Sequence, residues 1–144
     1  MILIYTNVKN LKTFKIFESG INFREKLSNI EEDIKDILLE LIDSGKVRVG
    51  FNDPYRNNKY VMIRTSQSDK AIYWDDVQEY VDRIVDYLGD NFVQLKVRKH
   101  PNYREDRNKN INTEPDWIEV NTDDDNSDID YGLWSVIIKF DIDD

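Results

Sequence analysis

The chain has 144 residues, the usual size of one domain, and carries 29 Asp and Glu against 20 Lys and Arg, a formal net charge of −9. It has no cysteine, which excludes disulfides, thiolate metal sites and a cysteine nucleophile, and which fits a reducing compartment. No apolar run approaches the roughly 20 residues of a membrane span, and the first ten residues lack the basic segment of a secretory signal. We therefore expect a single acidic α+β domain over residues 1–144, in the cytoplasm.

The first half of the chain predicts one clear helix between short strands. Residues 2–6 favour a strand, and residues 10–19 favour a second strand weakly over a helix. Apolar residues then recur at helical spacing over 29–43, and Ser28 with Glu31 forms a capping box that would satisfy free amide groups at the helix start. Residues 46–52 alternate between apolar and polar, which predicts the next strand.

The second half repeats this pattern and then ends in strands. A turn over residues 53–58 leads to a strand at 60–65, and the apolar stripe of 76–88, capped by Asp75, predicts a second helix. A strand follows at 92–99. After a polar loop, residues 116–121 and 131–142 predict a terminal hairpin around the acidic stretch 123–130.

This order of elements, β-α-β-β-α-β followed by a hairpin, is typical of a ferredoxin-like split unit. We expect an antiparallel sheet with both helices packed on one face, extended by the C-terminal β-hairpin.

Charge is divided unevenly among the predicted elements. The helix at 29–43 carries six acids against Lys35, a net of −5, and the segment 75–90 carries six acids against Arg83, again −5. The segment from Glu114 to the C-terminus has eleven acids and one lysine, a net of −10. The segments 46–65 and 95–110 are each +4. The molecule is therefore expected to be bipolar as well as acidic.

The helix acids recur every three or four residues, which places them in two stripes that would face solvent on the same side. An ordinary solvated helix face would also be charged, but like charges four residues apart cost stability, whereas mixed pairs would add to it. We therefore interpret the stripes and the acidic loop as a partner-binding surface: Glu32, Asp36, Glu40, Asp43, Asp75, Glu79, Asp82, Asp86, Asp123, Asp124, Asp125 and Asp128.

The opposite sheet face supports a competing hypothesis. If the apolar residues of the strands point toward the helices, basic and aromatic residues point away: Lys46, Arg48, Tyr60, Met62, Arg64, Phe92, Lys96 and Arg98. Cations that hold phosphates beside rings that stack on bases are what a single-stranded RNA or DNA platform needs. The alternative is that the terminal hairpin, with Trp117, Trp134 and its acids, covers and neutralises this face.

The residues of enzyme active sites are not evident. His100 is the only histidine, which excludes histidine metal clusters, and we expect it at the surface. Asp124, Asn126 and Asp128 have the spacing of a calcium loop, but Ile129 stands where the loop needs glycine and Ser135 where it needs glutamate. We therefore predict no enzymatic activity, no cofactor and no bound metal.

The favoured hypothesis is a non-enzymatic inhibitor that blocks a basic, nucleic-acid-handling protein such as a nuclease. Immunity proteins, anti-CRISPR proteins and phage-encoded DNA mimics share this small, acidic character, a likeness of type that no motif carries. The alternatives are a single-stranded RNA- or DNA-binding regulator and a phage structural or assembly component; homo-oligomerisation is left open. A phage protein would act in the host cytoplasm.

Overall fold

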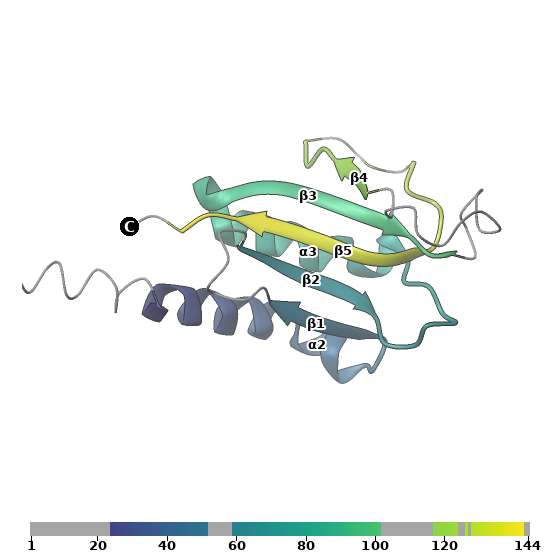
Figure 1. Ribbon diagram of the computed structural model, residues 1–144, viewed down its shortest axis with the longest axis horizontal. Helices are drawn as coiled ribbons and strands as arrows, with labels where there is room; N and C mark the ends of the chain where they lie inside the picture. The colour runs from purple at the N-terminus through teal and green to yellow at the C-terminus, as the bar shows by residue number, and fades with distance from the viewer. Residues whose placement is uncertain (1–23, 52–58, 102–116, 124–125, 127, 143–144) are drawn as a thin grey trace, which may run out of the picture.

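The computed structural model describes five stretches of the chain, at residues 24–51, 59–101, 117–123, 126 and 128–142. They form one antiparallel sheet with helices packed behind it (Figure 1). The five strands run in the order β1-β2-β5-β3-β4. Their bounds are β1 Val47–Phe51, β2 Lys59–Thr65, β3 Phe92–Lys99, β4 Trp117–Val120 and β5 Leu133–Phe140. The predicted α+β class is confirmed.

A split β-α-β unit lies at the centre of the sheet. Strand β2 leads through α3 (Trp74–Leu88) to β3, and these two strands are separated by β5, which pairs antiparallel with both. A split β-α-β unit is therefore present, while the first strand of the expected β-α-β-β-α-β order, at residues 2–6, lies outside the described residues. The inserted strand of the observed unit is the last strand of the chain.

The predicted terminal hairpin does not form. Strand β4 pairs only with β3 at the edge of the sheet, while β5 lies between β2 and β3. The reason is burial: β5 reads LWSVIIKF, and six of its eight residues are buried. A nearly continuous apolar run fits a central strand that is covered on both faces, whereas a hairpin at the rim would alternate.

The first helix starts earlier than predicted. Residues 24–37 are helical, Leu38 forms a turn, and α2 continues at Leu39–Asp43. Ser28, the predicted capping residue, lies inside the helix and is exposed. Leu27 is buried one heptad before Ile34, so the apolar stripe extends past the capping box and tertiary packing decides the helix start.

Helix α3 also starts before its predicted cap. Its N-cap is Tyr73, with no side-chain hydrogen bond, and Asp75 lies in the first turn. Trp74, only 2% exposed, anchors this end of the helix in the core. The predicted stop at Gly89 is confirmed: Gly89 has φ +54, in the left-handed region that favours glycine, and opens the 3₁₀ turn η2 (Gly89–Asn91).

Both helical segments cover the same face of the sheet, as predicted (Figure 1). Two hydrogen bonds join them: Tyr80 donates to Glu40 and Tyr87 donates to Asp33. Because the partner number falls as the α3 number rises, the helices are antiparallel. Beneath them the helix and strand side chains share one apolar core, where each fully buried aliphatic side chain contributes about 1.5–3 kcal/mol.

A β-bulge at the start of β3 reverses two predicted orientations. The pairing with β5 shifts between Phe92 and Gln94, so Val93 is 52% exposed although its position predicted the core. Phe92 instead packs against the core. After the bulge, Leu95 and Val97 are buried as expected.

Some predicted elements lie outside the described residues: the strands at 2–6 and 10–19, the turn at 53–58, and most of the loop from 101 to 115. In the stretches that are described, no helix combines the length and the apolar character needed to cross a membrane.

Candidate functional site

The acidic stripes lie together on the outer side of the helix layer. All eight of their carboxylates are exposed: Glu32, Asp36, Glu40, Asp43, Asp75, Glu79, Asp82 and Asp86. The two helical segments are neighbours on one sheet face, so the stripes form a single surface, which we call the acidic helix face.

Two tyrosines tie the helices of this face together. The Tyr80 hydroxyl donates to Glu40 Oε2 at 2.8 Å, and the Tyr87 hydroxyl donates to Asp33 Oδ2 at 2.6 Å. Burial, followed by the hydrogen bond to Asp33, raises the pKa of Tyr87 to about 12, and the hydrogen bond to Glu40 is the main cause that raises the pKa of Tyr80. Both hydroxyls therefore remain protonated donors at neutral pH.

The face also presents apolar surface that the acidic pattern did not predict. Leu39 is 52% exposed and Tyr87 is 41% exposed. Leu39 lies three residues after Asp36 and four before Asp43, which places these side chains on the same helix surface. Tyr87 lies against Asp33, whereas Leu39 is about 240° around its helix from Asp33, so the two are separate exposed side chains and not one patch. The sequence could have indicated this exposed side chain, because Leu39 is an apolar residue at an outward position of the predicted helix.

Carboxylate crowding on this face is visible in α3. Burial, and then repulsion from Asp86 one turn away, raises the pKa of Asp82. The pKa of Glu31 is also raised by burial, while Lys35 acts to lower it. Like charges at this spacing cost a helix a few tenths of a kcal/mol.

The acidic loop before β5 is organised by two asparagines. Asn126 adopts a left-handed φ of 57° and donates its side-chain amide to the Asn121 carbonyl at 2.9 Å. Asp123 and Asp128 are exposed, whereas Asp124 and Asp125 lie outside the described residues. In the parts of the chain that are described, no group of three or more His, Cys, Asp or Glu could hold a metal ion.

The other side of the sheet carries the predicted basic residues in register. Arg48 pairs with Arg64, Arg64 with Ser135, Ser135 with Arg98, and Arg98 with Trp117, so one row of three arginines crosses the sheet and ends at a tryptophan. The next two rows include Met62, Ile137, Lys96 and Glu119, then Tyr60, Lys139 and Gln94. We call this surface the open sheet face.

The predicted residues Arg48, Tyr60, Arg64, Lys96 and Arg98 thus come together, and three more join them. A depression of about 220 Å³ on this face is lined by Tyr60, Lys96, Trp117, Ile137 and Lys139. Trp117, Ile137 and Lys139 were missed because the terminal strands were expected to cover the sheet. Ile137 and Lys139 alternate along β5 with the core residues Val136 and Ile138, and this alternation could have placed them on this face.

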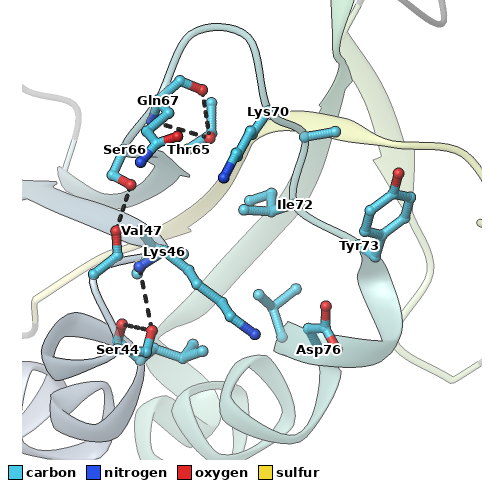
Figure 2. Close-up of a pocket in the computed structure, with 14 residues that line it drawn as sticks. Ser44, Lys46, Val47, Thr65, Ser66, Gln67, Lys70, Ile72, Tyr73 and Asp76 are labelled. Carbon is cyan, nitrogen blue, oxygen red and sulfur yellow. Dashed lines mark hydrogen bonds between the residues drawn. The ribbon is translucent and has the colours of Figure 1, made fainter.

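Lys46 does not belong to the open sheet face. It precedes β1 and lines a separate cavity of about 390 Å³ at the end of the molecule, where α2 ends and α3 begins (Figure 2). Lys46 and Lys70 extend over this cavity, and Leu41, Ile72 and Val77 supply its apolar lining. We call it the end pocket; the sequence did not indicate it because its residues come from two stretches of the chain, 41–47 and 65–77, that only the fold brings together.

Hydrogen bonds fix the rim of the end pocket. Ser44 Oγ donates to the Leu41 carbonyl at 2.6 Å and accepts from the Lys46 amide at 3.2 Å, while the Ser66 hydroxyl donates to the Gly45 carbonyl (Figure 2). Gly45 has φ +75, which suits the turn that brings these groups together. The pocket offers the ammonium groups of Lys46 and Lys70 above an apolar floor, because the Ser44 and Ser66 hydroxyls already donate to backbone carbonyls.

His100 is buried, not at the surface as its position suggested. It is 1% exposed, its Nε2 lies 2.8 Å from the Ser68 carbonyl oxygen, and its ring packs against Trp134 at 5.2 Å between centroids. A histidine held in this way packs the end of the sheet and lines neither described cavity.

Comparison with protein-family models, with curated proteins and with solved structures found no match to this chain.

Proposed function

We propose that the protein is a non-enzymatic inhibitor that uses its acidic helix face to block a basic, nucleic-acid-handling protein in the cytoplasm. The observation that carries the proposal is the arrangement of two exposed carboxylate stripes on adjacent helices. Rows of carboxylates imitate the phosphates for which a basic groove is built, and they speed encounter with it.

The hydrogen bonds of Tyr80 and Tyr87 support this function in a second way. They fix the position of the two helices relative to each other before any partner binds. A surface that is already ordered loses less conformational entropy on binding, so more of the contact energy becomes affinity. Leu39 would add apolar contact beside Asp36 and Asp43, and the carboxylates would form the polar part of the interface.

The test compares two charge variants of the full chain as bait. One removes four acids of the face (Asp36→Asn, Glu40→Gln, Glu79→Gln, Asp82→Asn). The matched control removes four exposed acids elsewhere (Asp90→Asn, Glu119→Gln, Asp130→Asn, Asp141→Asn). Proteins bound from a bacterial lysate are quantified by mass spectrometry at two salt concentrations.

The expected result is a basic nuclease or nucleic-acid-binding protein that the wild type and the control retain and the face variant loses. High salt should weaken its binding, because the steering and the rim contacts are electrostatic. Purified with the chain, this partner should lose its activity on nucleic acid. A partner that both charge variants bind equally well, or whose activity is unaffected, would refute the proposal.

A further inference from the structure

The open sheet face brings like charges together at a cost in stability. Arg48 and Arg64 are directly opposite across the β1–β2 pair, and Arg98 continues their row two strands further on. Like charges directly opposite on neighbouring strands destabilise a sheet. Glu119 is the acid among the described residues of these rows, and it lies beside Lys96. Arg98 is half-buried and has an interaction of its own, so the uncompensated pair within the described stretches is Arg48 with Arg64, both exposed. A ligand with several negative charges would offset this repulsion.

Aromatic rings are placed beside these cations. Tyr60 on β2 and Trp117 on β4 line the same depression, with Lys96 and Lys139 between them and Ile137 as its floor. Rings and ammonium groups in one shallow hollow fit a flat aromatic group joined to an anion. A nucleotide unit has this chemistry, because a base stacks on a ring while its phosphate meets a cation.

No helix or strand among the described residues lies across this face, although neighbouring side chains pack over its centre, where Ser135 is 2% and Ile137 is 9% exposed. The helices lie on the other side of the sheet, and β4 and β5 are part of the sheet instead of lying across it (Figure 1). The helix acids are on the outer side of a layer about 10 Å thick. Their field falls with distance across the molecule, so they offset the positive field of the face only in part.

We propose that the open sheet face binds single-stranded nucleic acid, with bases against Tyr60 and Trp117 and phosphates along Arg48 and Arg64. A single strand is favoured over a duplex because unstacked bases can reach rings on a flat sheet, whereas a duplex hides them. This binding is independent of the acidic helix face and would give the protein a second ligand on its opposite side.

The test measures fluorescence anisotropy of labelled 20-nucleotide oligo-dT and oligo-U, and of a 20-base-pair duplex, with the full chain at 20 mM and 200 mM salt. Single strands should bind more tightly than the duplex. Trp117→Ala and Tyr60→Ala should each weaken binding about tenfold, the usual effect of losing one stacking ring. Trp117→Phe should restore most of the affinity, which separates stacking from damage to β4.

Charge variants complete the test. Removing two cations with Arg48→Gln and Arg64→Gln should lower the slope of log affinity against log salt by about 1.4, at about 0.7 per phosphate contact on a single strand. The matched control, Lys35→Gln with Arg83→Gln on the helix side, should leave the slope unchanged, as should the four-acid helix variant.

No binding at 20 mM salt would overturn the proposal, and so would equal weakening by the Lys35 and Arg83 variant. Sedimentation velocity at several concentrations tests for self-association, in which the acidic helix face of a second copy would bind the open sheet face. Self-association that Arg48→Gln with Arg64→Gln abolishes, without oligonucleotide binding, would assign the face to that contact and would also overturn the proposal.

Discussion

Single side chains on the acidic helix face reduce local stability. Asp82 and Asp86 are exposed on α3 at a spacing of four residues, where a lysine partner would have stabilised the helix. The raised pKa of Asp82 has burial as its main cause and Asp86 as the second, and it records the cost of holding this carboxylate charged. If the carboxylate serves binding, its removal should improve stability while it harms affinity.

Asp82→Asn should therefore raise the free energy of unfolding at pH 7 by about 0.5 kcal/mol, the size of one relieved like-charge pair. The pKa of Asp82 in the folded chain lies above its ordinary value of 3.8, so the stability that the protonated form contributes is lost as pH rises through the folded pKa. The advantage of the variant should hence disappear as the pH falls toward 3.8. Urea unfolding of the wild type and the variant at pH 7 and pH 4 measures the gain in the free energy of unfolding and its loss at low pH.

An Asp82→Asn variant that is less stable than the wild type at pH 7 would contradict this account. Glu119→Gln, a similar change on the open sheet face beside Lys96, is the control and should give no gain.

At the scale of elements, burial determines where helices begin. Both helices begin before their predicted caps, which were the capping box of Ser28 with Glu31 and the cap at Asp75. The buried apolar residues near the observed starts are Leu27 and Trp74. A cap contributes about 1 kcal/mol, whereas burial of a large side chain contributes more. Burial of Trp74 stabilises the start of α3 although its indole Nε1 is buried without a hydrogen-bond partner in the described structure.

Trp74→Phe should cost less than about 1.5 kcal/mol of stability, because the loss of ring volume is offset by removal of a buried N–H that has no acceptor. Trp74→Ala should cost about 3–5 kcal/mol, since it opens a cavity at the start of α3. Urea unfolding followed by circular dichroism gives both values. Similar losses for the two variants would mean that the indole N–H has an acceptor in the protein.

At the scale of the whole molecule, the sheet depends on its last strand. Strand β5 pairs with both β2 and β3, so it joins the two halves of the sheet, and Val136 and Ile138 lie in the core with no exposed surface. Its position also leaves the open sheet face uncovered by the terminal strands. The fold and the bipolar distribution of charge therefore both follow from one strand pairing.

A chain that ends after Asp130 should fail to fold, because removing β5 separates β2 from β3 and exposes the core. A peripheral hairpin, by contrast, could be removed with most of the structure kept. Dispersed amide signals in a two-dimensional NMR spectrum of the truncated chain would contradict the central position of β5. Val136→Ala in the full chain, expected to lose about 1–3 kcal/mol, and the exposed control Asp141→Asn, expected to lose little, test the same point without truncation.

Periodicity and turn chemistry in the sequence by themselves determined the α+β class, the two amphipathic helices, the positions of the described strands and the glycines that end the helices. These features are local, because a helix stripe or a Gly89 turn depends on residues within a few positions. They also placed the helix acids outward, since an amphipathic helix has only one face left for charge.

Only the tertiary structure decided which strands are neighbours, and with them the open sheet face. The insertion of residues 133–140 between strands some 70 and 40 positions earlier depends on which long-range pairing buries the most apolar surface, and local spacing does not encode that choice. The same long-range packing buried His100, moved Lys46 to the end pocket, and brought Trp117 and Lys139 beside Tyr60.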